Sequence, residues 1–147
     1  MQTHRQELSE QLLEDQKRVS LRGEISVRNK NLSQAAAKAG VVNYANFQDF
    51  GYMGLYGGLR RKDIHAQKKL KPKEKILDHM GSEELGANIF RATQAEAKIR
   101  RENVLGEHKA GEVHFEVGKK VRKIIKELGG TMPERLPRVD HVRQSKR

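Results

Sequence analysis

The chain has 147 residues, of which 35% are hydrophobic and 5% aromatic, so we expect one ordinary domain or two very small ones with a thin aliphatic core. The 30 Lys and Arg residues outnumber the 19 Asp and Glu residues, and the formal charge of +11 favours polyanionic partners: nucleic acid first, then acidic proteins or anionic membranes. The lack of cysteine excludes disulfides and Cys-ligated metal sites, and no run approaches the ~18 apolar residues of a membrane span.

A long helix is predicted over residues 5–39, because apolar residues recur there at helical intervals. Gly23 is a poor helix residue, so one bent helix or two helices would both fit, and Gly40 is a natural stop. The apolar stripe is narrow. We therefore expect this N-terminal helix to mediate association, either with a second protomer as a homodimer or with another domain.

Residues 43–59 combine most of the aromatic side chains with four glycines, Gly51, Gly54, Gly57 and Gly58. Such a segment is not expected to be regular helix throughout, and we predict a compact turn with buried rings. A phosphate-loop interpretation is weak, because the segment lacks the Gly-Lys-Ser/Thr signature and no strand precedes it. Phosphate contact stays open because Arg60 and Arg61 follow directly.

Residues 60–75 are strongly basic, with a local net charge of +6. Two short helices are predicted, over 61–69 and 73–80, with Pro72 at the start of the second. Such a cluster releases counterions from a phosphate backbone without reading base sequence, although a solvated face is an equal alternative. The candidate nucleic-acid-binding residues are Arg60, Arg61, Lys62, Lys68, Lys69, Lys71 and Lys73.

Two longer helices are predicted over 82–103 and 108–128, the first with Ser82 as N-cap. The second has a strict amphipathic stripe. We expect Val113, Val117, Val121, Ile124 and Leu128 to be buried against the helix that carries Leu85 and Ile89. The opposite face is a second, weaker basic candidate: Lys119, Lys120, Arg122, Lys123 and Lys126.

The predicted fold is therefore all-α, an extended helical domain of about five helices with no sheet. We divide it into a long N-terminal helix or helix pair (1–40), a helical domain with a Gly-rich turn (41–130) and a basic, mobile tail (131–147). No catalytic, metal or cofactor site is expected, since no His pair has zincin spacing and Asp78-His79 lacks a nucleophile. Residues 1–7 lack the apolar region of a signal peptide, so we expect a cytoplasmic protein.

Several longer blocks point to one family. They are Gly51–Leu59 (GYMGLYGGL), Lys75–Leu85 (KILDHMGSEEL), Ala87–Gln94 (ANIFRATQ) and His114–Arg122 (HFEVGKKVR), followed by Glu127–Glu134 (ELGGTMPE). In this order the blocks resemble the C-terminal region of the DNA-damage-inducible protein D family of bacteria, over nearly the whole chain. Members of this family are longer, with an N-terminal domain similar to BRO and antirepressor proteins. We therefore expect a C-terminal piece or a short relative.

The resemblance implies induction in the SOS response and a role around recombination and repair, which centre on a recombinase filament on single-stranded DNA. The family provides no catalytic residues to transfer. We expect a nucleoid-associated binding protein that modulates a recombinase filament or single-stranded DNA. The alternative is a protein-interaction or oligomerisation domain of an antirepressor-like regulator without nucleic-acid contact, whose binding would not weaken linearly in log salt.

Overall fold

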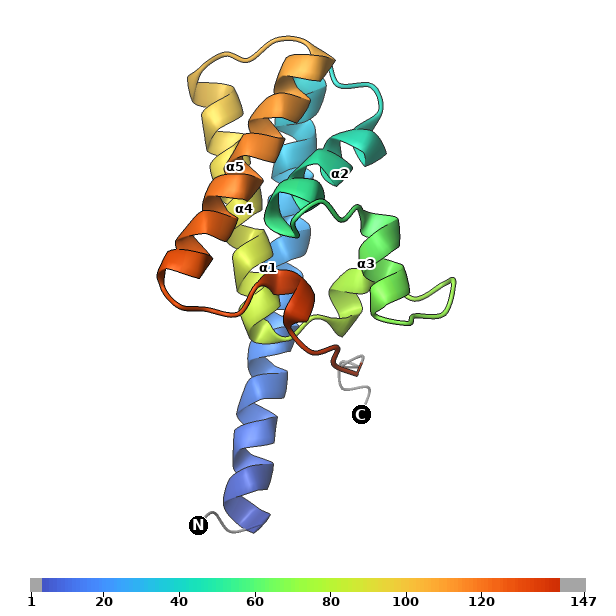
Figure 1. Cartoon of the computed structure of the whole chain (residues 1–147), viewed down its shortest axis with the longest axis vertical. Helices are drawn as coiled ribbons and strands as arrows, with labels where there is room; N and C mark the ends of the chain where they lie inside the picture. The colour runs from blue at the N-terminus through green and yellow to red at the C-terminus, as the bar shows by residue number, and fades with distance from the viewer. Residues whose placement is uncertain (1–3, 141–147) are drawn as a thin grey trace.

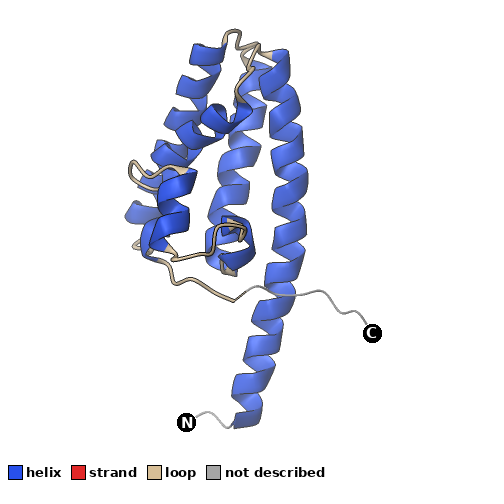
Figure 2. Ribbon diagram, turned by 90° about the vertical axis from the view of Figure 1, so that its right-hand side faces the viewer, coloured by secondary structure: helices blue, strands red, loops and turns tan. Residues whose placement is uncertain are grey.

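The computed structural model of the protein describes residues 4–140 and contains only helices, turns and loops in that range. The predicted all-α fold without a sheet is confirmed (Figure 2). The elements are α1 (His4–Lys38), α2 (Tyr44–Leu55), α3 (Arg61–Gln67), the 3₁₀ helix η1 (Ile76–His79), α4 (Ser82–Arg101), α5 (Glu107–Glu127) and the 3₁₀ helix η2 (Pro133–Arg135). No helix of this described part is both long and apolar enough to cross a membrane.

The N-terminal helix α1 is one continuous helix (Figure 1). Arg18, Ile25 and Leu32 recur every seven residues and are buried along one side of α1, which packs mainly against α4. Gly23 is exposed, and the helix continues through this position without a break. Residues 4–13 are all exposed, so the first turns of α1 project beyond the body of the molecule.

A close crossing of α2 and α5 forms the centre of the domain. A Cβ atom built on Gly54 of α2 would lie 2.3 Å from the carbonyl oxygen of Phe115, and one on Gly118 of α5 would lie 2.7 Å from that of Gly51. The helices approach this closely because these positions lack side chains. The expectation of an irregular turn was therefore wrong for Gly51 and Gly54, which lie inside regular helix, and the turn is confined to residues 56–58.

The amphipathic stripe of α5 is buried only in part. Val117 and Val121 are buried, and Val113 is partly buried and packs against the core. Ile124 and Leu128 are 44% and 80% exposed, which contradicts the predicted burial of the whole stripe. The last turns of α5 lie beside the start of α4, and an open pocket between them is bordered by Pro133 and Leu136 of the C-terminal segment.

The connections differ from the prediction in two further ways. In place of a helix over 73–80, the structure has only the four residues of η1. Gly81 rather than Ser82 is the N-cap of α4. The carboxylate of Glu14 in α1 accepts hydrogen bonds from the backbone nitrogen and the hydroxyl of Ser82, at 3.0 and 2.9 Å, and so replaces a local cap.

The C-terminal segment through residue 140 is held against the body, whereas a mobile tail was expected over 131–147. Pro133 is buried, and Arg122 of α5 forms two hydrogen bonds with the carboxylate of Glu134 at 2.8 and 2.9 Å. The backbone nitrogen of Val139 donates to the carbonyl of His79 at 3.1 Å. We call residues 131–140 the C-terminal strap; residues 141–147 lie outside the described range.

Candidate nucleic-acid interface

The basic segment begins at α3, and two carboxylates define this helix start. Asp49 of α2 accepts a hydrogen bond from the backbone nitrogen of Arg61 at 3.0 Å, and Asp63 accepts one from that of Arg60 at 2.9 Å. Both acids therefore bind amide groups at a helix N-terminus, where negative charge is favourable. Their local role is to fix α3, and the side chains of Arg60 and Arg61 extend into solvent.

The end of α3 is equally well defined. Lys69 adopts a left-handed conformation (φ 57°), and the backbone nitrogens of Lys69 and Leu70 donate to the carbonyls of Ala66 and His65 at 3.0 and 3.3 Å. The loop that follows protrudes from the body (Figure 1). Glu74 accepts a hydrogen bond from the backbone nitrogen of Lys71 at 2.7 Å and thereby closes the loop.

Six of the seven candidate residues lie on one exposed stretch formed by α3 and its following loop. None of the six forms an ion pair with another residue in the range 4–140. We call them the α3 basic cluster: Arg60, Arg61, Lys62, Lys69, Lys71 and Lys73. The nearby acids Asp63 and Glu74 bind backbone amides and form no ion pair with these side chains, and six cations against two carboxylates leave the segment with a net positive charge.

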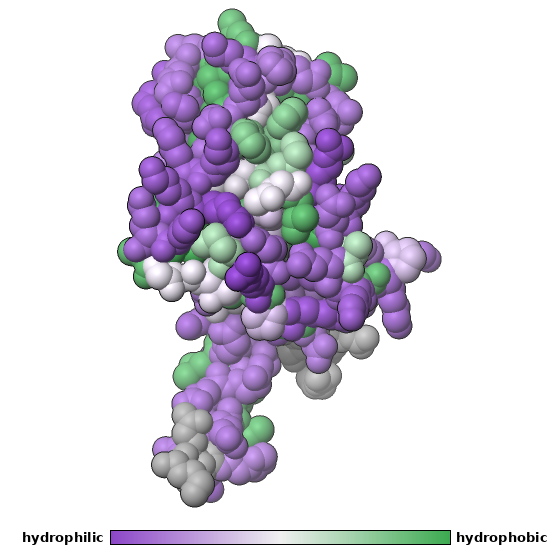
Figure 3. Space-filling model, viewed as in Figure 1, coloured by the Kyte–Doolittle hydropathy of each residue, from purple (hydrophilic) through white to green (hydrophobic). Residues whose placement is uncertain are grey.

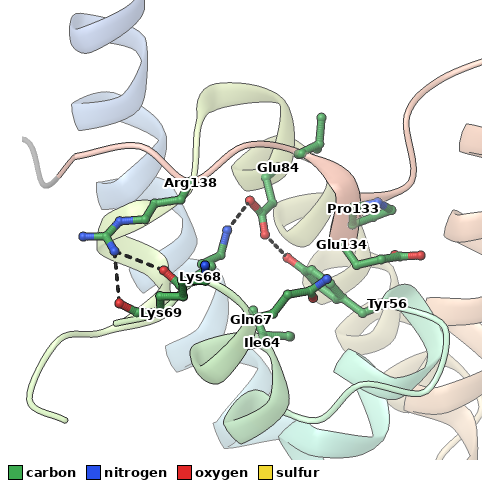
Figure 4. A pocket seen from close by; sticks show the side chains of 10 residues that line it. Tyr56, Ile64, Gln67, Lys68, Lys69, Glu84, Pro133, Glu134 and Arg138 are labelled. Atoms are coloured by element: carbon green, nitrogen blue, oxygen red, sulfur yellow. Dashed lines mark hydrogen bonds and ion pairs between the residues drawn. The ribbon is translucent and has the colours of Figure 1, made fainter. Parts of the chain in front are cut away.

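The seventh candidate, Lys68, is buried and therefore does not belong to the exposed cluster. Its Nζ atom lies 2.9 Å from Oε1 of Glu84, and the two side chains are 8% and 1% exposed (Figure 4). Tyr56 donates its hydroxyl hydrogen to the other oxygen of Glu84. Burial raises the pKa of Glu84, and the charge of Lys68 acts in the opposite direction.

The C-terminal strap brings one further cation to the cluster. The guanidinium of Arg138 donates to the backbone carbonyls of Lys68 and Lys69 at 3.1 and 3.2 Å, at the C-terminal end of α3 (Figure 4). A cavity of about 270 Å³ separates this strap from Tyr56 and Glu84. Sequence reasoning missed Arg138 because 70 residues separate it from Lys68.

A network of hydrogen bonds between buried side chains leads from Tyr56 to His114 of α5. Asn88 donates to the Tyr56 hydroxyl at 3.0 Å, and Arg91 donates to Asn88 at 3.1 Å and to Nε2 of His114 at 2.6 Å. His114 in turn donates from Nδ1 to the carbonyl of Phe47 at 2.9 Å. Burial, followed by the charge of Arg91, holds the pKa of His114 well below its usual value, so this histidine is neutral and structural.

The second basic face on α5 is only partly available. Arg122 is bound to Glu134 of the C-terminal strap, and Lys119 lies 4.0 Å from the carboxylate of Glu116. Lys120, Lys123 and Lys126 are exposed and have no ion pair in the described part of the chain. This face therefore offers three exposed cations without an ion pair, fewer than the α3 basic cluster.

Comparison with known proteins agrees with the sequence blocks. Residues 12–145 match the family model described as the DinD C-terminal domain. The chain is 55% identical over 145 residues to the DNA damage-inducible protein D of Escherichia coli (strain K12), an alignment that covers 93% of this chain and 53% of that protein. The chain thus spans about half the length of the curated relative it matches. No solved structure matches.

Proposed function

This chain belongs to the DinD family, and from that premise we propose that it is a DNA-damage-response binding protein that modulates a recombinase filament or single-stranded DNA. The name of its Escherichia coli relative supports the damage response. The SOS response, which the family resemblance implies, centres on a recombinase filament on single-stranded DNA, and these are therefore the proposed partners. Direct contact with DNA is supported by one observation above all: the α3 basic cluster is exposed and forms no ion pair within residues 4–140.

The composition of this cluster favours contact with the phosphate backbone rather than with bases. Six cations within 14 residues can each replace a counterion on a nucleic acid. Stacking of single-stranded bases needs exposed aromatic rings, but the nearest tyrosines, Tyr52 and Tyr56, are buried. Binding through this surface should therefore be strongly salt-dependent and nearly independent of sequence.

The alternative is a protein-interaction domain without nucleic-acid contact. Exposed apolar side chains favour it, in particular Leu12 on α1 and Phe90 and Leu128 on the α4–α5 side. The two functions differ in their response to salt. For phosphate contact, the logarithm of the affinity falls linearly with the logarithm of the salt concentration, whereas the affinity of association through apolar surfaces does not fall in this way.

The deciding experiment is a titration of fluorescent single-stranded oligonucleotides of mixed sequence with the full chain, over a salt series, with and without recombinase. If all six cations contact phosphate, a plot of log affinity against log salt should fall with a slope of about −4, at roughly 0.7 per contact. Absence of binding at low salt would refute direct DNA contact. Binding to recombinase alone, insensitive to salt, would favour the interaction domain.

A further inference from the structure

The first turns of α1 form a projecting arm with an apolar side. We call residues 4–15 the α1 arm. Leu8 and Leu12 lie one turn apart and hence on one face, and they are 54% and 62% exposed. In Figure 3 apolar side chains stand out on the otherwise hydrophilic arm. Because α1 is continuous and leads away from the body (Figure 1), this face is not covered by the described part of its own chain.

A second uncovered apolar surface lies between α4 and α5. We call it the α4–α5 groove; it encloses about 270 Å³ and is lined chiefly by Ala87, Phe90, Ile124, Leu128, Pro133 and Leu136. Gly86 also lines it, and a side chain at that position would meet nothing within 4 Å. The groove is open and apolar, and it is bounded by two helices and the C-terminal strap. A helix that presents leucines one turn apart is the ligand that such a surface fits.

We propose that the α1 arm of one copy of this chain seats Leu8 and Leu12 in the α4–α5 groove of a second copy. The charges of the two surfaces are complementary. Asp15 of the arm is paired with Arg18, and Arg122 of α5 with Glu134. Apart from these pairs, the arm has three acidic side chains and one arginine, whereas residues 116–127 of α5 have four basic and two acidic side chains. This pairing covers both exposed apolar surfaces at once. It is independent of the α3 basic cluster, which lies on another part of the molecule.

The contact must be intermolecular. The arm is the straight continuation of a helix whose later turns are packed against α4, so it cannot fold back onto its own groove without breaking α1. If two copies exchange arms reciprocally, both grooves are filled and the assembly closes as a dimer. Association should therefore depend on the arm and on the groove equally.

Disulfide trapping tests this geometry directly, because the natural chain contains no cysteine. Two single variants, Leu12→Cys and Leu128→Cys, are purified separately, mixed and oxidised under mild conditions. The proposal predicts a covalent dimer that contains one copy of each variant, in excess over either self-linked dimer. Predominant self-linkage of Leu12→Cys would show that arms pair with each other, and would overturn the proposal.

Sedimentation equilibrium provides an independent measurement. The natural chain should change from 16.8 kDa toward about twice that mass as its concentration rises. Two double variants remove one apolar surface each: the arm variant combines Leu8→Gln with Leu12→Gln, and the groove variant combines Ile124→Gln with Leu128→Gln. Each should raise the dimer Kd about tenfold or more. Val42→Gln with Leu105→Gln is the matched control, since both side chains are exposed but lie outside the two surfaces. A natural chain that stays monomeric, or a control that weakens the dimer equally, would contradict the proposal.

Discussion

Lys68 and Glu84 form an ion pair inside the domain, and the next residue, Lys69, is exposed. The pair joins the end of α3 to the first turn of α4, and Tyr56 satisfies the second carboxylate oxygen. Two adjacent lysines of the same basic segment thus have different roles. Lys68 fixes the position of α3, and Lys69 belongs to the surface that α3 presents.

Substitution of Lys68 should therefore affect stability, whereas substitution of Lys69 should affect DNA binding. Lys68→Ala leaves the Glu84 carboxylate buried without its cation and should lower the free energy of unfolding by about 3–5 kcal/mol. Lys69→Ala changes an exposed side chain and should alter it by less than about 0.5 kcal/mol, while it weakens DNA binding. Urea unfolding and DNA titration of both variants measure this difference, and equal destabilisation by the two substitutions would contradict it.

The same pair makes a prediction about pH. The pKa of Glu84 is raised by burial, so above the unfolded-state value of 4.5 the folded protein binds more protons than the unfolded chain, and stability declines as pH rises. Lys68→Met removes the opposing charge and raises this pKa further. The stability deficit of Lys68→Met relative to the natural chain should thus be larger at pH 8 than at pH 5, and a constant deficit would show that Glu84 is not involved.

The crossing of α2 and α5 predicts a large difference between two glycines. A Cβ at Gly54 meets the backbone of α5 at 2.3 Å, so Gly54→Ala must push the helices apart and should destabilise the domain by about 1–3 kcal/mol or more. Gly23→Ala is the control, since its Cβ would meet nothing within 4 Å and α1 is helical there. It should stabilise the domain by about 0.5–1 kcal/mol. Thermal unfolding of both variants provides the comparison.

His114 should make the domain sensitive to acid. Its pKa is well below 6.5 in the folded protein, so below pH 6.5 the unfolded chain binds the extra proton and the free energy of unfolding falls as pH falls. The slope should reach at most about 1.4 kcal/mol per pH unit. His114→Gln should flatten it between pH 5 and 7, whereas exposed His108→Gln should not. An unchanged slope in His114→Gln would assign the acid sensitivity elsewhere.

The C-terminal strap should be released by loss of one carboxylate. Glu134→Gln weakens both hydrogen bonds with Arg122, so trypsin should cleave after Arg138 severalfold faster while the helical core stays folded. Glu127→Gln is the control, because it removes the same charge from an exposed position on α5. Mass spectrometry of the early fragments identifies the cleaved bond. Equal cleavage rates in the two variants would mean that the ion pair does not hold the strap.

The sequence predicts the helices of this fold well, because their evidence is local. The apolar period of α5 and the glycine after α1 are visible within one or two turns of chain. The errors arise where a distant partner decides the structure. Gly51 and Gly54 allow the close approach of α5 within a regular helix instead of forming a turn, and the partner of the buried Lys68, Glu84, lies 16 residues further along the chain. Composition alone did not distinguish the C-terminal strap from a mobile tail, since its anchors, Arg122 and His79, belong to other elements.

The central claim is that the α3 basic cluster contacts phosphate, and matched charge removal tests it most directly. The α3 variant combines Lys62→Ala, Lys69→Ala and Lys73→Ala. The α5 variant, which loses the same charge and serves as the control, combines Lys120→Ala, Lys123→Ala and Lys126→Ala. A third variant lacks residues 141–147 only, so that the C-terminal strap remains. Each is titrated with single-stranded DNA over a salt series.

Loss of three phosphate contacts should flatten the slope of log affinity against log salt by about 2 in the first variant, and should weaken binding equally for all DNA sequences. The other two variants should keep the slope of the natural chain. If instead the α3 variant binds normally and the α5 variant or the truncation loses the salt dependence, the phosphate contact lies elsewhere and our assignment of the interface is wrong.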